Sequence, residues 1–245
     1  MAGLIVKNLY KNFNINNKEI LALNNINLYI EDGSFVTIVG KSGCGKTTLL
    51  RIICSLEKQT CGEIEFTSDN KEEDISRRVG IVFQEPRLMP WLTVEQNMAF
   101  PLLKNKNKEE TYYIVHKYLE MLGLESFKDA YPSQISGGMA QRVSLGRTLC
   151  YDPEIILMDE PLGALDAFNR RKLQNEFINI FIENKKTVIF VTHDVEEAIY
   201  LGQKVVVMDD GKVSSEISVP LEYYRDTTDL RFLKLREDIL HLFLK

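Results

Sequence analysis

Short apolar runs of strand length alternate along the chain with segments in which apolar residues follow helical spacing. The run SFVTIVG (34–40) is rich in β-branched residues and ends in glycine, and KTTLLRIICSL (46–56) then follows the spacing of a helix. Two later apolar runs, PEIILMDEP (153–161) and TVIFVTHD (187–194), carry polar residues at their ends. Buried strands that alternate with helices are typical of a mostly parallel sheet, so the pattern predicts an α/β fold.

The segments on either side of this alternation predict further elements. LIVKNLYKNF and ALNNINLYI near the N-terminus have strand-like patterns with Asn-rich turns between them, and GEIEF and RVGIVFQ predict two more strands. The block 92–150 is mainly helical in spacing, with a polar stretch at 104–110 and a break at Tyr131–Pro132. The segment KVVVMDDGKV (204–213) carries an Asp-Gly hairpin signal, and we expect the tail at 220–245 to be helical.

The composition is that of an ordinary soluble globular protein. The chain has 245 residues, of which 44% are hydrophobic and 27% charged, which suits one large domain with a sizeable core. The net charge of −5 argues against a general nucleic-acid binder, which would usually be basic. No apolar run approaches the length of about 18 residues that a membrane span needs, and no signal peptide is evident, so we expect a cytoplasmic protein. The four cysteines form no CxxC pair, so we expect no metal site built on them.

A phosphate-binding loop lies between the first buried strand and the helix that follows it. GKSGCGKT (40–47) matches the pattern G-x-x-x-x-G-K-[ST], with a strand before it and a helix after it. Glycines let backbone N–H groups surround phosphates, Lys46 reaches the terminal phosphates, and the Thr47 hydroxyl ligates Mg²⁺. We expect the nucleotide to be bound by Gly40, Lys41, Ser42, Gly43, Cys44, Gly45, Lys46, Thr47 and Thr48.

Polar residues at the ends of other strands predict a catalytic site. Asp159 ends the run IILMD and is placed to hold Mg²⁺, and the adjacent Glu160 is placed to polarise an attacking water. His193 ends VIFVT and can donate a hydrogen bond to a γ-phosphate, while Gln84 ends GIVF and can ligate Mg²⁺ or hold water. Taken alone, His193 is also consistent with a histidine satisfied by local backbone, and Gln84 with a surface amide.

A second anion-binding helix start lies far from the phosphate loop. In QISGGMAQRVSLGRT (134–148), Ser136 can cap a helix, and Gly137 and Gly138 leave backbone N–H groups open to an anion. A simple helix cap is the alternative interpretation. Because this segment has no lysine of its own, we expect it to complete the nucleotide site of a second copy in a two-fold dimer.

The ordered set GKSGCGKTT, VFQEP, ISGGMAQR, ILMDEP, GALDA and VTHD resembles the nucleotide-binding subunit of ATP-binding-cassette (ABC) transporters, over about residues 4–225. The resemblance implies an α/β P-loop NTPase core with a mostly parallel sheet, an N-terminal antiparallel β subdomain and an inserted α-helical signature subdomain. Within this single domain we expect the core at 1–91 and 151–220, the helical subdomain at 92–150 and a helical tail at 221–245.

The resemblance also implies roles for single residues in ATP hydrolysis. Phe13 would stack on adenine, and Asp166 would belong to a dimer-contact loop. Glu160 would be the catalytic carboxylate, assisted by Lys46, Gln84 and His193, and Mg²⁺ would be held by Thr47, Gln84 and Asp159. The nucleotide of the opposite chain would be contacted by Ser136, Gly137, Gly138 and Met139.

Two departures from the family pattern bear on the assignment. The usual Leu-Ser-Gly-Gly-Gln is Ile-Ser-Gly-Gly-Met here, and a signature that ends in methionine is similar to importer ATPases of the nitrate, sulfonate and taurine type. The stretch EPRLMPWLTVEQNMAFPL (85–102) resembles the same branch. Met139 removes the amide that is usual there. Gly146 stands where the branch commonly has alanine, at a cost of about 1 kcal/mol inside a helix, and nothing in the sequence explains it.

These observations predict an ATPase subunit at the cytoplasmic face of a membrane. Two copies would enclose two Mg-ATP molecules, and hydrolysis would power import of a nitrate-, sulfonate- or taurine-like solute through permease subunits. The bulky residues Leu88, Met89 and Trp91 in PRLMPWL, from Pro86 to Leu92, predict the docking surface for the permease, with local core packing as the alternative. A periplasmic or lipid-anchored solute-binding protein would act indirectly, and no nucleic acid is expected.

Three other functions are weighed against this one. An importer of another solute, such as a thiamine precursor, would have a similar sequence. A soluble ABC ATPase acting on DNA or ribosomes would carry a long coiled-coil insertion or two cassettes, whereas only 90 residues separate Lys46 from Ser136 here. A P-loop kinase would not need Ser136–Gly138, Gln84 and His193 together. We expect no regulatory ligand module after residue 245.

Overall fold

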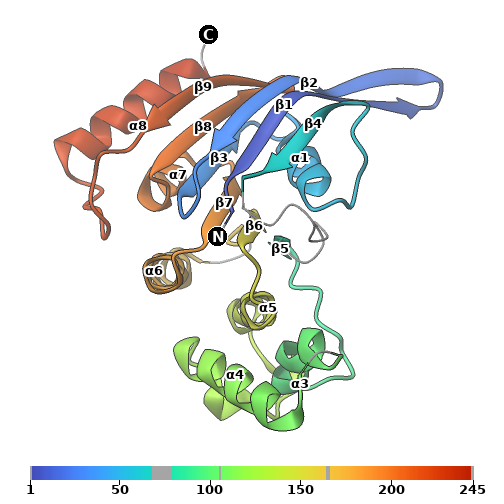
Figure 1. Cartoon of the computed structure of the whole chain (residues 1–245). Helices are drawn as coiled ribbons and strands as arrows, with labels where there is room; N and C mark the ends of the chain where they lie inside the picture. Colours follow the sequence, from blue (N-terminus) through green and yellow to red (C-terminus); the bar gives the residue numbers. More distant parts are fainter. Residues whose placement is uncertain (1, 68–78, 105, 164–165, 244–245) are drawn as a thin grey trace.

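The strands of the chain form two sheets, which a computed structural model describes for residues 2–67, 79–104, 106–163 and 166–243 (Figure 1). The larger sheet has six strands in the order β5-β6-β7-β3-β8-β9. Its strands are β3 (Phe35–Gly40), β5 (Val79–Val82), β6 (Ile155–Asp159), β7 (Thr187–Thr192), β8 (Lys204–Asp209) and β9 (Lys212–Ser218). All neighbouring pairs are parallel except β8 and β9, which confirms the predicted, mostly parallel α/β sheet.

The antiparallel pair at the edge of this sheet is the predicted Asp-Gly hairpin. Asp209 pairs with Lys212 across a two-residue turn. Asp210 has a φ of 44° and Gly211 a φ of 73°. Positive φ at both central residues is the requirement of the tight hairpin turn that follows the twist of its strands, and Asp-Gly meets it at low cost.

The smaller sheet is antiparallel and is built from the N-terminal segment. It contains β1 (Leu4–Ile15), β2 (Lys18–Ile30) and β4 (Cys61–Phe66), in the order β2-β1-β4. Helix α1 (Lys46–Ile53) shares one apolar core with this sheet and with one face of the larger sheet. The helix that follows the phosphate loop is therefore packed between two sheets, and Leu49 and Leu50 are completely buried there.

The block predicted to be helical forms a lobe that stands away from the sheets in Figure 1, drawn in green to yellow. It contains α3 (Val94–Ala99), α4 (Lys108–Met121) and α5 (Gly137–Cys150), with short 3₁₀ turns at Phe100–Leu102, Glu125–Phe127 and Pro132–Gln134. The helices α6 (Ala167–Asn184), α7 (Val195–Leu201) and α8 (Leu230–Leu242) share a second core with this lobe and with the other face of the larger sheet. Its division from the rest as a subdomain stays an interpretation.

Within the C-terminal tail, which is expected to be helical, α8 begins at Leu230 and an irregular segment precedes it. Arg225 is buried and donates hydrogen bonds to the backbone carbonyls of Leu221, Ile199 and Gly202, which ties the preceding segment to α7. Asp226 then accepts from the backbone N–H of Thr228 at 2.8 Å and closes a turn. These contacts replace helical hydrogen bonds until Asp229 caps α8.

Gly146, which the sequence leaves unexplained, lies where α5 passes closest to its neighbours. A Cβ atom at this position would lie 2.5 Å from Cε of Met98 on α3 and 2.9 Å from Cδ1 of Leu122. Both side chains are almost fully buried, so they have little free space to move into. The glycine permits close packing of α5 in the helical lobe, which offsets its weak helix propensity.

We expect Gly146→Ala to lower the free energy of unfolding by about 1 kcal/mol. Crowding by the added methyl group costs about 1–3 kcal/mol, and the better helix propensity of alanine offsets about 1 kcal/mol of that cost. In a Met98→Ala background the same change should instead stabilise by about 1 kcal/mol, since the new methyl group then fills vacated space. Urea unfolding of the four proteins measures this coupling. An effect of Gly146→Ala that is equal in both backgrounds would contradict the packing explanation.

Candidate functional site

The residues predicted to act on a nucleotide follow strands that end at one edge of the larger sheet. Strand β7 lies between β3 and β6, and the register pairs Val39 with Thr192 and Asp159 with Val191. The carboxyl ends of these three strands therefore lie side by side. Ligands of open α/β sheets bind at this edge, so the topology places the phosphate loop, Asp159 and His193 around one site.

The phosphate loop leaves β3 and enters α1 through residues in left-handed backbone conformations. Gly43 has a φ of 82° and Gly45 a φ of 101°. A Cβ on Gly45 would lie 2.6 Å from the carbonyl oxygen of Ala22, so the close approach of the loop to β2 also requires glycine. The Lys46 side chain is only 4% exposed, and its ammonium donates to the carbonyls of Gly40 at 2.7 Å and Lys41 at 3.0 Å.

A cavity of about 340 Å³ opens above this loop. It brings Gln84 and Glu160 to the phosphate loop, as the sequence predicts. Its lining consists of Ala22, Ser42, Gly43, Gly45, Lys46, Thr47, Thr48, Gln84 and Glu160. Gly40, Lys41 and Cys44 do not line it. Cys44 is buried in the core under the loop, and burial raises the pKa of its thiol.

Thr47 lines the cavity and contacts Asp159, which does not line it. The Thr47 hydroxyl donates to Oδ1 of Asp159 at 3.0 Å. Burial raises the pKa of the Asp159 carboxyl, and the hydrogen bond from Thr47 opposes that shift. The described residues contain no cluster of three or more His, Cys, Asp or Glu side chains that could hold a metal. A hydroxyl, a carboxylate and the Gln84 amide fit Mg²⁺, which takes few protein ligands and fills its other positions from phosphates and water.

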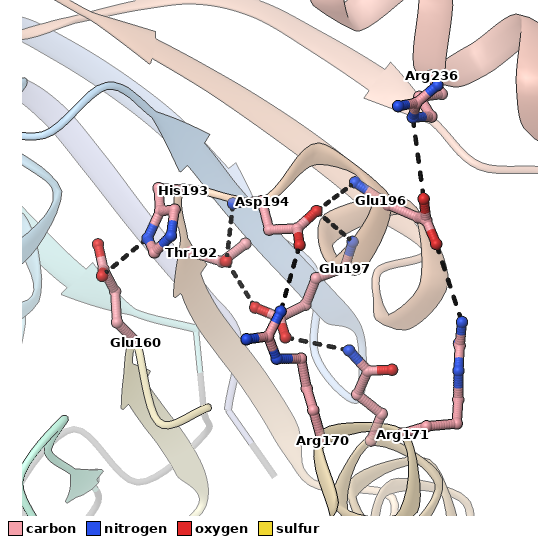
Figure 2. Close-up of polar contacts among 10 residues, drawn as sticks. Glu160, Arg170, Arg171, Thr192, His193, Asp194, Glu196, Glu197 and Arg236 are labelled. Carbon is pink, nitrogen blue, oxygen red and sulfur yellow. Dashed lines mark hydrogen bonds and ion pairs between the residues drawn. The ribbon is translucent and has the colours of Figure 1, made fainter. Parts of the chain in front are cut away.

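Glu160 contacts two groups of the candidate site, the lysine of the loop and the histidine that follows β7. Figure 2 shows its contact with His193. Its Oε2 atom is 3.0 Å from Nδ1 of His193, and its Oε1 atom is 3.9 Å from Nζ of Lys46. Glu160 also has a φ of 45°, a strained conformation for a residue with a side chain, and its N–H donates to the Val191 carbonyl at 3.0 Å. Strain of this kind persists where surrounding structure holds it, here at the centre of the candidate site.

Phe13, predicted to stack on adenine, lies on β1 opposite Ile20 and does not line the cavity. The Lys11 ammonium is 4.6 Å from the centre of its ring. A cation over one face of an aromatic ring is an attractive contact in its own right. The role of Phe13 in binding adenine therefore stays a prediction.

The signature residues lie on the helical lobe, away from the phosphate loop of the same chain, as the positions of α5 and α1 in Figure 1 show. Ser136 caps α5 by accepting a hydrogen bond from the Met139 N–H at 3.3 Å. Gly137 is exposed, and a Cβ there would meet open space. Met139 packs against the apolar core of the lobe, so a hydrophobic side chain in place of glutamine has a local reason.

The backbone of the segment Pro86–Leu92 is hydrogen-bonded by two residues that the sequence analysis did not identify. Asn97 is completely buried, and its amide donates to the carbonyls of Met89 and Leu92 while its oxygen accepts from the Met89 N–H. Arg147 donates to the carbonyls of Pro86 and Arg87. A polar residue within a buried helical stretch was the only signal for Asn97.

Of the three bulky side chains predicted to form the docking surface, Trp91 alone is strongly exposed, at 72%. Leu88 packs against the main core, and Met89 is half-buried. The surface that Pro86–Leu92 offers to a partner is therefore centred on one aromatic side chain.

The predicted dimer-contact residue Asp166 is exposed and precedes α6, and its carbonyl accepts from the Arg170 N–H at 2.9 Å. The neighbouring positions 164 and 165 of the motif GALDA lie outside the described residues. In the part of the chain that the structure describes, no helix is long and apolar enough to cross a membrane.

Known proteins resemble this chain in sequence and in fold. The family model described as ABC transporter matches residues 23–163. An ABC transporter ATP-binding protein of Methanocaldococcus jannaschii is 48% identical over 242 residues, which cover 98% of this chain and 90% of that protein. An aliphatic sulfonates import ATP-binding protein of Bacillus cereus is 44% identical over 236 residues, 95% of this chain and 92% of that protein. A solved dimeric ATP-binding cassette, in a post-hydrolysis state with ADP and Pi, has a TM-score of 0.78 at 35% identity, covering 89% of this chain and 100% of that one.

Proposed function

Since this chain belongs to the ABC transporter family as an ATP-binding cassette ATPase, we propose that it powers import of a small sulfonate or a related oxyanion through membrane permease subunits. The observation that carries the proposal is the contact of Glu160 with both Lys46 and His193 beside the phosphate loop. That arrangement places a carboxylate base, an ammonium group and an imidazole around the expected position of a terminal phosphate. The sulfonate is suggested by the Bacillus cereus relative and by the methionine at position 139.

The residues of the site divide the work of hydrolysis among them. Glu160 accepts the proton of the attacking water, because its carboxylate lines the cavity above the loop. Lys46 and the backbone N–H groups of the loop stabilise negative charge on the phosphates. Toward an ionised Glu160, His193 donates through Nδ1, which orients the carboxylate. Thr47, Asp159 and Gln84 would hold Mg²⁺, which supplies charge neutralisation on the phosphate oxygens.

The second half of each site comes from another copy of the chain in this proposal. Ser136 and Gly137 are exposed at a helix start that lies apart from the chain's own phosphate loop. Backbone N–H groups at such a helix start bind anions. A two-fold dimer brings each helix start to the nucleotide of the other copy, and the dimeric cassette with ADP and Pi that this chain resembles supports that arrangement.

The permease docks on the segment Pro86–Leu92 in this proposal, with Trp91 as its anchor. The segment follows Gln84, so a change at the nucleotide is passed directly to the docking surface. A large exposed aromatic side chain on a rigidly held loop is the usual centre of a protein interface. The chain would thus be a peripheral subunit at the cytoplasmic face of the membrane. The solute would be selected by the permease and a solute-binding protein.

We expect ATP hydrolysis by the complex of this chain with its co-purifying permease to rise when a sulfonate-loaded binding protein is added. Trp91→Ala should abolish this stimulation and weaken permease binding at least about tenfold, because hot-spot aromatics carry 2 kcal/mol or more. Phosphate release and pull-down of the permease are the measurements. Leu230→Ala is the matched control. Leu230 is 82% exposed on α8, so this substitution also removes exposed apolar area, but away from the segment Pro86–Leu92.

Three results would count against parts of this proposal. Retained permease binding by a folded Trp91→Ala variant would remove the docking role. Stimulation by a thiamine precursor, with none by a sulfonate or nitrate, would replace the solute. Transfer of phosphate to an acceptor in place of release to water would replace the activity by that of a kinase.

A further inference from the structure

A buried chain of hydrogen bonds runs behind His193 and joins three elements (Figure 2). Thr192, the last residue of β7, donates through its hydroxyl to Oε2 of Glu197 on α7 at 2.6 Å. Gln174 on α6 donates through Nε2 to Oε1 of the same carboxylate at 3.0 Å. Nothing in the sequence pattern singles out these three side chains, and the hydrolytic roles described above do not use them.

The carboxylate at the centre of this chain is an unusual group to bury. Thr192 is 2% exposed, Gln174 5% and Glu197 6%. Burial raises the pKa of Glu197, and the hydrogen bonds from Thr192 and Gln174 oppose that shift. Both carboxylate oxygens face donors, so the arrangement suits the ionised form. A buried carboxylate is costly unless it is hydrogen-bonded, and an apolar residue would fill the same space at lower cost.

Capping of α7 does not account for Glu197. Asp194 already caps this helix, because its Oδ1 atom accepts from the N–H groups of Glu196 at 2.9 Å and Glu197 at 3.2 Å. The Glu197 side chain points instead to Thr192, one residue before His193. The buried Glu197 carboxylate therefore contacts the end of β7 and does not cap α7.

The Thr192 hydroxyl fixes the backbone on both sides of His193. It donates to Glu197 and also accepts from the Asp194 N–H at 3.0 Å, so it bridges across the histidine. The His193 side chain itself is 62% exposed, and its direction depends on this backbone. A cavity of about 30 Å³ is bordered by Glu160, His193, Thr192 and Glu197 together, which places the buried chain directly behind the catalytic pair.

We propose that Glu197, with Thr192 and Gln174, is a positioning unit that holds His193 against Glu160 for ATP hydrolysis. The inference rests on the proposed ATPase function and adds positioning residues to it. Glu197 does not touch the nucleotide in this proposal and acts only through the turn that carries His193.

The same unit connects His193 to the dimer contact. Gln174 lies on α6, which begins directly after Asp166, and Arg170 of the same helix is 3.8 Å from the Asp194 carboxylate. A shift of α6 when two copies meet would therefore reach His193 through Gln174 and Glu197.

The test compares Thr192→Val, which keeps the shape and removes the hydroxyl, with Thr192→Ser, which keeps the hydroxyl. We expect Thr192→Val to lower kcat by about 10–100-fold, since a misplacement of about 1 Å costs up to about 100-fold, with KM for ATP unchanged within about twofold. Thr192→Ser should stay within about threefold of the wild type. In a His193→Ala background, Thr192→Val should have almost no further effect, because both changes act on the same group.

Each other result has a definite meaning. An unchanged kcat in Thr192→Val, or equal further loss in the His193→Ala background, overturns the positioning role. A parallel loss of kcat and ATP affinity in both threonine variants shows a structural role only, which also overturns it. If Thr192→Val does not fold, Gln174→Met removes one hydrogen bond of the unit and should lower kcat by about 3–10-fold at constant KM. Absence of hydrolysis in the wild type would refute the proposed function instead.

Discussion

Glu160→Gln is expected to lower the rate of ATP hydrolysis by about 10²–10⁴-fold while ATP binding is retained, because an amide cannot accept the proton of the attacking water. The substitution preserves the shape of a side chain that lies 3.0 Å from His193 and lines the cavity above the loop. With binding intact and turnover blocked, the two copies should remain together around two ATP molecules. The variant therefore tests the catalytic base and the dimer in one protein.

Light scattering with and without ATP measures the dimer, and phosphate release measures turnover. Glu183→Gln is the matched control, because it makes the same change at an exposed position near the C-terminal end of α6. Failure of ATP to produce a dimer of Glu160→Gln would remove the support for a nucleotide enclosed between two chains. Wild-type turnover in this variant would show that another group takes the proton.

Lys46→Ala is expected to weaken ATP binding by about 10–100-fold. Charge-assisted hydrogen bonds contribute about 1.5–3 kcal/mol, and about 1.4 kcal/mol corresponds to a factor of ten in affinity. The ammonium is held inside the loop by the carbonyls of Gly40 and Lys41, so it is already oriented before a phosphate arrives. Little side-chain entropy is then lost on binding, which places the expected effect toward the upper end.

Titration calorimetry with ATP measures the affinity of this variant. Lys234→Ala, at an exposed position on α8, removes the same charge without touching the loop and should bind ATP as the wild type does. Circular dichroism checks the fold, because the substitution also leaves two loop carbonyls without their donor. Equal affinity of Lys46→Ala and the wild type would contradict the role of the lysine in phosphate binding.

Much of the fold can be predicted from the sequence, because buried strands and the polar residues at their ends are local patterns. The β-branched run before Gly40 and the runs before Asp159 and His193 are each decided by neighbouring residues. Parallel strands align their carboxyl ends, so the strand pattern predicts one common edge for the phosphate loop, Asp159 and His193. The observed strand order then places them side by side. Thr47 and Asp159, which are 112 positions apart, hydrogen-bond for this reason.

Other features depend on contacts between distant segments, which no local pattern encodes. The need for glycine at position 146 comes from Met98 and Leu122, both on other parts of the lobe. Asn97 and Arg147 have no distinguishing pattern in the sequence, and their role is evident only from their hydrogen bonds to the segment Pro86–Leu92. The segment before α8 is held by Arg225, which donates to the carbonyls of Ile199 and Gly202, and no pattern within the tail encodes these contacts.

The separation of the Ser136 helix start from the phosphate loop has a consequence for mixtures of defective chains. In the proposed dimer, each nucleotide lies between the phosphate loop of one chain and the helix start of the other. A chain damaged only at its loop and a chain damaged only at its helix start are each inactive as homodimers. Paired with one another, they place both defects in one site and leave the other site whole. The two mutant alleles would therefore complement each other, with one working site restored in each mixed pair.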